Sequence, residues 1–254
     1  MSKLPEIQKL LEKNYESGIT LITPTGDRNV CWSKCNFYIT NQTYKGSLQW
    51  IIADDGNEKL DLSNLKIDYT HTTANYPGNK AKSINHNICR ALQYVKYDKI
   101  AIIEDDDIYH PKYLERLLER LDHYDLIGEG NSRYYNINGY YRINHNTKHA
   151  SLFQTGLKTI PCIEHLYVST LREQSAFIDS RLWNKKVKKF VFCDDVTAIG
   201  MKGLPGRKGI GIGHRPSSAF NKDKDFKVLK QWLKNYPEDY IDFYINLRQI
   251  ACKS

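Results

Sequence analysis

The chain has 254 residues, of which 41% are hydrophobic, enough for one α/β domain with a full core or for two small domains. Its formal net charge of +8 at pH 7 favours an anionic partner such as a nucleotide, a nucleic acid or a membrane face. Residues 1–18 lack the apolar core of a signal peptide and no stretch approaches a membrane span, so we expect a cytoplasmic protein without a membrane partner.

The six cysteines are scattered along the chain. Cys31 and Cys35 are four residues apart, as on one face of a helix, but no second pair completes a zinc site. We therefore expect free thiols in a reducing compartment.

Hydrophobic periodicity predicts alternating strands and helices in the first half of the chain. An amphipathic helix is expected over residues 4–15. The strands that we expect next cover residues 19–22, 49–53, 67–71 and 99–103, and the helices cover residues 29–42, 83–97 and 111–121. This order predicts an α/β fold with a mostly parallel central sheet flanked by crossover helices.

Four carboxylates, Glu104 to Asp107, directly follow the buried strand at 99–103. Ligands bind at the carboxyl ends of strands in open α/β sheets. Side chains two apart on a strand point the same way, so Asp105 and Asp107 are expected to converge while Asp106 points elsewhere. Clustered carboxylates repel one another unless a cation holds them, and hard oxygen ligands suit Mg2+ or Mn2+. A solvated acidic strand end that caps the next helix is the alternative, and the run of three Asp favours the metal site.

Two other predicted strands also end in charged residues. Asp27 and Arg28 lie in the loop after the strand at 19–22, and Asp54 and Asp55 end the strand at 49–53. Because the carboxyl ends of parallel strands meet at one edge of a sheet, these residues are expected to converge with the acidic run.

Several segments resemble the family-2 glycosyltransferases of the GT-A fold, in order and over about residues 19–121. They are Ile19–Thr25, Gln42–Tyr44, Trp50–Gly56, Gly78–Asn85 and Glu104–Asp107.

The resemblance implies a nucleotide-sugar donor, expected to be a UDP-sugar, and a divalent metal. Asp54 or Asp55 would contact the base or ribose, Asp105 the ribose and Asp107 the metal. The donor-binding set implied in this half of the chain is Thr23, Pro24, Thr25, Asp27, Arg28, Asp54, Asp55, Lys80, Asn85, Asp105 and Asp106.

The second half opens with a predicted strand at 125–128 and a segment, residues 131–149, that is rich in tyrosine and arginine. Aromatic rings beside guanidinium groups suit stacking on sugars or bases. A twisted hairpin around Asn138–Gly139 explains the tyrosines equally well as strand formers. The sequence leaves both interpretations open.

Asp179 begins a predicted helix within residues 175–183. This resembles the family's acidic motif followed by Leu and Arg, in which the acid is the general base, although Ile178 replaces the usual first acid. Asp194 and Asp195, which follow an apolar run, are the rival candidates. The helix after Asp179 favours Asp179.

Residues 200–214 contain six glycines together with Lys202, Arg207 and Lys208, which predicts a flexible basic loop. The loop lacks the Walker pattern, but glycines let backbone amides approach phosphates. Lys202 and Arg207 are expected to neutralise a departing diphosphate. By the resemblance, His214 would complete the metal shell with Asp107. Helices at 227–236 and 238–251 close the chain.

We expect one GT-A domain over residues 1–254, with a donor half at about 19–130 and an acceptor half at about 131–254. The predicted activity is metal-dependent inverting glycosyl transfer, with Asp179 as the base.

Three motifs also resemble small glycosyltransferases of bacteriophages and prophages: Thr-Pro-Thr-Gly-Asp-Arg, Asp-Ser-Arg-Leu-Trp and Met-Lys-Gly-Leu-Pro-Gly-Arg. Some enzymes of that kind modify hydroxymethylated pyrimidines in double-stranded DNA, in the host cytoplasm. A glycan or small-molecule acceptor is the alternative. A nucleotidyltransferase would need a longer loop than Thr23–Arg28, and a non-catalytic nucleic-acid-binding protein would have no use for the clustered carboxylates.

Overall fold

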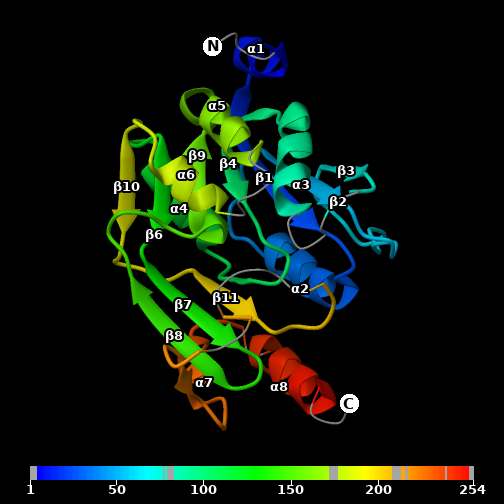
Figure 1. The fold of residues 1–254 in the computed structure, drawn as a ribbon, viewed down its shortest axis with the longest axis vertical. Helices are drawn as coiled ribbons and strands as arrows, with labels where there is room; N and C mark the ends of the chain where they lie inside the picture. The colour runs from blue at the N-terminus through cyan, green and yellow to red at the C-terminus, as the bar shows by residue number, and fades with distance from the viewer. Residues whose placement is uncertain are drawn as a thin grey trace.

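The computed structural model describes residues 5–76, 78, 83–171, 177–207, 213–214, 217–237 and 239–251. Its main feature is a seven-stranded sheet in the order β10-β6-β9-β4-β1-β2-β3 (Figure 1). The strands are β1 (Glu16–Thr25), β2 (Leu48–Asp54), β3 (Tyr69–Thr73), β4 (Tyr97–Ile102), β6 (Leu126–Glu129), β9 (Thr155–Lys158) and β10 (Lys189–Phe192). Only β9 pairs antiparallel with its neighbours among these strands. The prediction of a mostly parallel central sheet is therefore confirmed.

Helices cover both faces of this sheet, and each face has its own apolar core. The helices are α1 (Pro5–Glu12), α2 (Asn29–Thr40), α3 (Ser83–Ala91), α4 (Tyr113–Leu121), α5 (Thr159–Thr170) and α6 (Ile178–Trp183). Leu21 of β1 packs in a cluster with side chains of α2 and α4. Ile22, the next residue, faces the opposite cluster, which contains side chains of α1, α3, α5 and α6. Alternation along β1 thus supplies both cores, as expected of a strand buried on both faces.

A second sheet of five strands has the order β12-β8-β7-β11-β5. Its strands are β5 (Ile108–Tyr109), β7 (Asn131–Asn136), β8 (Tyr140–His145), β11 (Ala198–Lys202) and β12 (Asn221–Lys222). Outside the two sheets, short helical turns occur at η2 (Leu92–Tyr94) and η3 (Leu152–Gln154). In Figure 1 this sheet lies below the first, with the last helices α7 (Lys227–Trp232) and α8 (Asp239–Ala251) at the bottom of the view. β7 and β8 form the hairpin predicted around Asn138–Gly139, and Gly139 has a φ of 84° in its turn.

Two segments that were predicted as loops are strands. β1 continues through Thr23 and Pro24 to Thr25, because its pairing with β2 extends to the Thr25–Asp54 pair. Gly200 and Lys202 lie in β11 because it pairs with β7, and a Cβ at Gly200 would be 2.7 Å from the Tyr134 ring. Gly200 thus permits close packing between these two strands, whereas the remaining glycines of residues 200–214 follow the end of β11 at Lys202.

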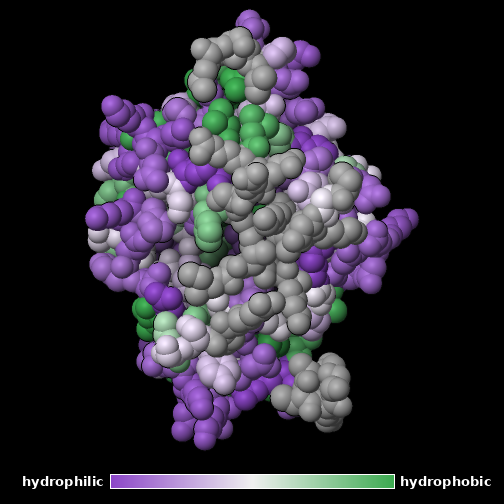
Figure 2. All heavy atoms as spheres, in the orientation of Figure 1, coloured by the Kyte–Doolittle hydropathy of each residue, from purple (hydrophilic) through white to green (hydrophobic). Residues whose placement is uncertain are grey.

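The described surface in the view of Figure 2 is mostly hydrophilic, which agrees with the charged composition. The cysteines that the structure describes, Cys31, Cys35, Cys89, Cys162 and Cys193, are free thiols as predicted. None of the described helices has the length and apolar character needed to cross a membrane.

Candidate functional site

The charged strand ends converge as the sequence predicted. Arg28, which follows β1, contacts the acidic run after β4: its Nη1 lies 2.8 Å from Asp105 Oδ1 and 2.9 Å from Asp106 Oδ2. Thr25, the last residue of β1, donates its hydroxyl to Asp105 Oδ2 at 2.6 Å. The carboxyl ends of β1 and β4 therefore form one site.

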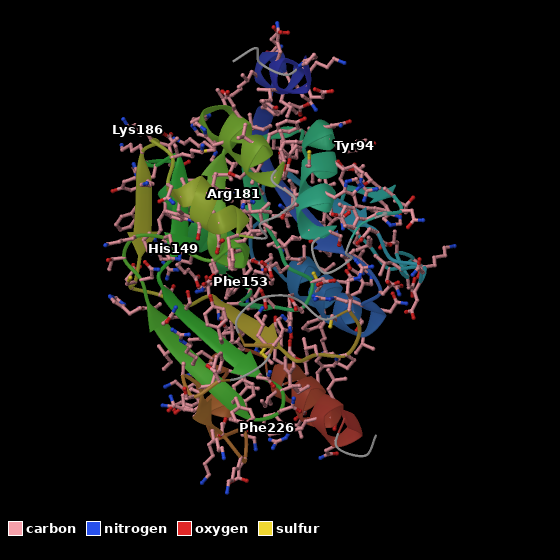
Figure 3. All side chains as sticks on the ribbon, viewed as in Figure 1. Tyr94, His149, Phe153, Arg181, Lys186 and Phe226 are labelled. Carbon is pink, nitrogen blue, oxygen red and sulfur yellow. The ribbon has the colours of Figure 1, made fainter. Side chains whose placement is uncertain are left out.

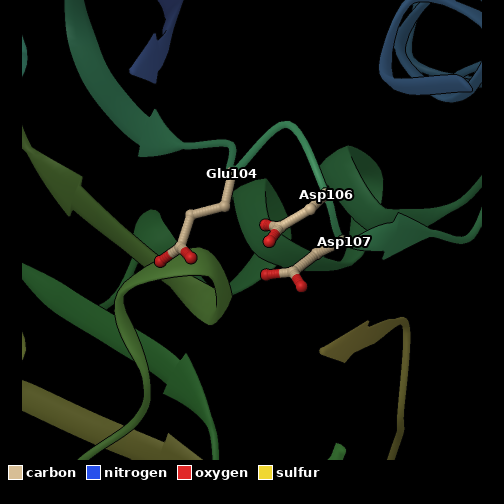
Figure 4. Close-up of side chains that lie close together, drawn as sticks. All are labelled: Glu104, Asp106 and Asp107. Atoms are coloured by element: carbon tan, nitrogen blue, oxygen red, sulfur yellow. The ribbon is translucent and has the colours of Figure 1, made fainter. Parts of the chain in front are cut away.

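The acidic run itself is arranged differently from the prediction. β4 ends at Ile102, and a turn at residues 105–106 separates it from β5. Ligand atoms of Glu104, Asp106 and Asp107 lie within 4.8 Å of one another, and Figure 4 shows these three side chains around the turn. The expectation that Asp105 converges with Asp107 while Asp106 points elsewhere is wrong, because the alternation of a strand does not apply to a turn: Asp106 lies with Asp107, and Asp105 is outside the group. Glu104, which the sequence did not single out, takes the place of Asp105.

This acidic cluster, Glu104, Asp106 and Asp107, has the chemistry of a divalent metal site. Asp106 Oδ1 and Asp107 Oδ2 are buried and accept no hydrogen bond from the described part of the chain. Buried carboxylate oxygens without partners are costly, and hard oxygen donors are the ligands that Mg2+ and Mn2+ prefer. The residues present fit such an ion.

The electrostatics of the cluster favour the binding of a cation. Burial raises the pKa of Glu104 to about 7 and raises that of Asp107 well above its ordinary value. Burial acts the same way on Asp106, but the charges of Arg28 and Lys202 and other favourable contacts together outweigh burial and lower the pKa of Asp106. A bound cation would favour the charged form of all three groups.

Lys202 and His214 lie beside the acidic cluster. Lys202 is buried on β11, with its Nζ 3.3 Å from Asp107 Oδ1. Burial lowers the pKa of His214 to about 4, and the Lys202 charge adds to this effect, so the imidazole is neutral near pH 7 as a metal ligand must be. His214 is outside the group of ligand atoms within 4.8 Å, so its role as a ligand stays a prediction.

The segment after β11 is tied to the ends of β1 and β2 through Arg207. The Arg207 guanidinium donates to both carboxylate oxygens of Asp55, at 2.7 and 2.8 Å, and to Asp27 Oδ2 at 2.8 Å. Arg28 Nε donates to the Arg207 carbonyl at 2.8 Å. Arg207 is therefore paired with carboxylates here, at the position where the sequence predicted a diphosphate-binding cation.

The other predicted donor-binding residues are mostly used in structural contacts. Asp54 accepts the Gly56 N–H at 2.7 Å, and the Thr23 hydroxyl accepts from the Trp50 indole at 2.8 Å within the core. Pro24 and Asn85 are buried. Lys80 lies outside the described residues. The donor-binding roles of these residues stay predictions.

Two residues on α3 belong to the site and were missed. Asn87 Nδ2 donates to Asp55 Oδ1 at 2.9 Å and to the Thr25 carbonyl at 3.2 Å. Arg90 donates to Asn87 Oδ1 at 3.1 Å. Polar residues three apart on the face of α3 that meets the sheet were the available signal.

Asp179 lies in the first turn of α6, as predicted, and its charge acts on Glu104. Burial raises the pKa of Asp179, while His149 lowers it; Figure 3 shows His149 below α6. The alternative candidates for the base, Asp194 and Asp195, lie on a different surface, beside α4. Asp194 pairs with Arg120 and Asp195 with Arg116 of α4, and their side chains are 68% and 37% exposed. The observations favour Asp179, and its role as a base stays a prediction.

The tyrosines of the hairpin are largely used in packing. Tyr135 is buried and donates its hydroxyl to Asp223 Oδ2 at 3.0 Å. The Tyr141 ring packs edge-on against Trp232, and the Arg133 guanidinium lies over the same indole. The structure therefore favours the hairpin interpretation over a free stacking surface.

Comparison with known proteins agrees with this fold and site. The model of the family described as glycosyl transferase family 2 matches residues 39–201, which is more than half of the chain and includes the acidic cluster. No curated protein matches the sequence significantly.

Among solved structures, Staphylococcus aureus TarS matches with a TM-score of 0.54 and 13% identity, covering 72% of this chain and 36% of TarS. A shorter form of TarS with UDP-GlcNAc matches with a TM-score of 0.52 and 13% identity, covering 76% of this chain and 59% of that one.

The mannosyltransferase PcManGT of Pyrobaculum calidifontis, solved with GDP-Man and Mn2+, matches with a TM-score of 0.50 and 11% identity. That alignment covers 79% of this chain and 63% of PcManGT, so the chain spans less than two thirds of each of these proteins. These likenesses concern the fold, whereas the family match concerns the sequence. The chain belongs to glycosyl transferase family 2.

Proposed function

We propose that this chain, as one GT-A domain, transfers a sugar from a UDP-sugar to an acceptor hydroxyl with inversion at the anomeric carbon. The observation that carries the proposal is the acidic cluster after β4, which lies inside the family-2 match and has two buried oxygens that no described residue contacts by a hydrogen bond. The nucleotide-sugars in the TarS and PcManGT structures support this class of donor.

Glu104, Asp106 and Asp107 would hold Mn2+ or Mg2+, with His214 as a further ligand. When bound, such an ion neutralises the charge that develops on the leaving diphosphate.

The donor's nucleoside would lie along the ends of β1 and β2. Asp54 or Asp55 would contact the base or ribose and Asp105 the ribose, beside Thr25 and Arg28. Positive charge for the diphosphate would come from Lys202 and from Arg207, which would exchange its contacts with Asp27 and Asp55 for phosphate oxygens.

Asp179 would accept the proton of the acceptor hydroxyl at its carboxylate. The hydroxyl oxygen then forms a bond to the anomeric carbon from the face opposite the diphosphate, and the bond between that carbon and the diphosphate breaks. A raised pKa suits Asp179 to this role, because a stronger base takes the proton more readily.

For the acceptor we favour a 5-hydroxymethylpyrimidine in double-stranded DNA, modified in the host cytoplasm by a phage-encoded enzyme. The net charge of +8 and the phage-type motifs support this choice. The base would have to leave the duplex to reach the site. A glycan or small-molecule acceptor is the alternative outcome of the test.

The test follows nucleoside diphosphate release in the presence of Mn2+ and a panel of nucleotide-sugars, with and without duplex DNA that contains 5-hydroxymethylpyrimidines. Release that rises only with modified DNA supports the full proposal. Release that is independent of DNA supports the transferase and rejects the DNA acceptor. Absence of release with every donor rejects the proposed activity.

Two substitutions test the assigned residues. Asp107→Asn and Asp179→Asn should each lower kcat by at least about 100-fold, because one removes a metal ligand and the other the general base. Asp194→Asn is the matched control, since this exposed carboxylate pairs only with Arg120 among the described residues, and it should retain activity. Full activity of the Asp179 variant together with loss in the Asp194 variant would reverse the assignment.

A further inference from the structure

Two buried cations flank the acidic cluster, and they come from distant parts of the chain. Arg28 follows β1 and Lys202 ends β11. Their side chains are 14% and 7% exposed. Lys202 also lies against the Phe153 ring, with its Nζ 5.8 Å from the ring centroid. Cations this buried are held in place by their carboxylate partners.

Arg28 bridges Asp105 and Asp106 through its Nη1, which lies 2.8 Å from Asp105 Oδ1, and within the acidic cluster each cation contacts one oxygen of one carboxylate. Arg28 Nη1 lies 2.9 Å from Asp106 Oδ2. Lys202 Nζ lies 3.3 Å from Asp107 Oδ1, which also accepts the Met201 N–H at 2.8 Å. The second oxygens, Asp106 Oδ1 and Asp107 Oδ2, are both buried and lack a hydrogen-bond partner among the described residues.

We infer that Arg28 and Lys202 are positioning residues: each holds one oxygen of a metal-binding carboxylate so that the other oxygen faces a divalent cation. The inference rests on the proposed function in one respect: it takes this cation to be the ion that binds the diphosphate of the nucleotide-sugar donor. Groups behind the ligands of a metal orient them and commonly change metal affinity 10- to 100-fold when removed.

Formal charge agrees with this arrangement. With all four ionised, the three carboxylates of the cluster and the neighbouring Asp105, which shares Arg28, carry four negative charges. Arg28 and Lys202 carry two positive charges, and the difference, 4 − 2, equals the charge of one divalent cation. The two buried cations therefore lower the charge of the site to a value that a single ion can balance.

A competing interpretation is that the Lys202 ammonium occupies the metal position and must leave before an ion binds. The geometry disfavours it, because Lys202 contacts Asp107 Oδ1 and leaves Oδ2 without a partner in the described part of the chain. The two interpretations predict opposite changes when the lysine is replaced. A competitor would weaken metal binding by its presence, whereas a positioning residue strengthens it.

The experiment titrates Mn2+ into the full chain without donor or acceptor and measures free Mn2+ by electron paramagnetic resonance. Lys202→Met should raise the Kd for Mn2+ by about 10- to 100-fold. Lys202→Arg, which keeps the charge and the donors, should stay within several-fold of the wild type. Lys222→Met, at an exposed lysine on β12 of the same sheet, is the matched control and should leave the Kd unchanged.

Thermal unfolding of each variant checks that it is folded. If Lys202→Met does not fold, Arg28→Gln tests the same inference at the other carboxylate and should raise the Kd in the same way. Mn2+ binding by Lys202→Met that is as tight as in the wild type, or tighter, overturns the inference, as does a wild type that binds no Mn2+. If Lys202→Met binds Mn2+ more weakly than the wild type, but the wild type releases no nucleoside diphosphate from any donor, the inference is supported and the proposed activity is rejected.

Discussion

Three consecutive aspartates in this protein have three different environments. Asp105 is held by Thr25 and Arg28 and is absent from the acidic cluster. The Arg28 guanidinium lowers the pKa of Asp106 against the effect of burial, whereas burial raises that of Asp107. At the scale of single residues, the groups around a carboxylate determine its pKa and its contacts more than its position among the three aspartates does.

The raised pKa of Asp179 predicts the pH dependence of activity. A general base works in its charged form, and burial shifts the loss of that charge to a higher pH than for an exposed aspartate. We expect kcat/KM to fall as the pH is lowered through this raised pKa and to level off above it. His149→Ala should move the acidic limb to still higher pH, because His149 lowers the pKa of Asp179.

The measurement is a pH–rate profile of both proteins with saturating Mn2+. His123→Ala, at an exposed histidine after α4, is the control and should leave the limb in place. A limb that does not move in the His149 variant would contradict the coupling of His149 to Asp179.

At the scale of elements, the segment that follows β11 is held closely against the loop after β1. The Arg207 N–H donates to the Asp27 carbonyl at 3.2 Å, and the Arg207 side chain joins Asp27 to Asp55. Gly206 permits this approach, because its φ is 96° and a Cβ there would lie 2.5 Å from the Asp27 carbonyl oxygen. The glycine thus serves close packing of two loops at the site.

Gly206→Ala should lower the free energy of unfolding by about 1–3 kcal/mol, because it combines left-handed backbone strain with a steric clash. Urea unfolding monitored by circular dichroism measures the change. Gly46→Ala is the control, since the three atoms nearest to a Cβ there all belong to the end of the Tyr44 side chain, which can move, and it should cost less than about 0.5 kcal/mol. Equal stability of the two variants would contradict the role of Gly206.

At the scale of the whole molecule, the site lies where the two sheets meet. Glu104 to Asp107 connect β4 of the first sheet to β5 of the second, and β11 of the second sheet brings Lys202 to Asp107. The tyrosine-rich hairpin packs on α7 through Trp232, so its tyrosines are largely used in packing. The proposal of a DNA acceptor therefore depends on the net charge and the phage-type motifs.

If modified DNA is the acceptor, its affinity should fall steeply with salt through counterion release. We expect a loss on the order of 10- to 100-fold between about 50 and 200 mM salt, as for a protein that neutralises a few phosphates. Fluorescence anisotropy with a labelled duplex containing 5-hydroxymethylcytosine measures it, with an unmodified duplex as the reference. Affinity that is insensitive to salt would contradict the DNA acceptor.

Local features were predictable because neighbouring residues determine them. The apolar runs of β1 and β4, the hairpin turn at Gly139 and the helix that begins near Asp179 depend on periodicity, turn chemistry and helix signals within a few residues. The motifs likewise placed the chain in family 2, and the parallel order of the sheet followed from the order of its elements.

The arrangement of the site was not predictable, because it depends on contacts between residues far apart in the sequence. The turn after β4 decides that Glu104, and not Asp105, joins Asp106 and Asp107. Pairing with β7 places Gly200 to Lys202, the start of the glycine-rich stretch, in a buried strand, and packing of α3 on the sheet brings Asn87 to Asp55. The sequence by itself determined which charged groups reach one edge of the sheet, whereas the tertiary structure decided which of them touch. The reason is that a shift of the backbone by one residue turns each side chain to the other face and so changes its partners.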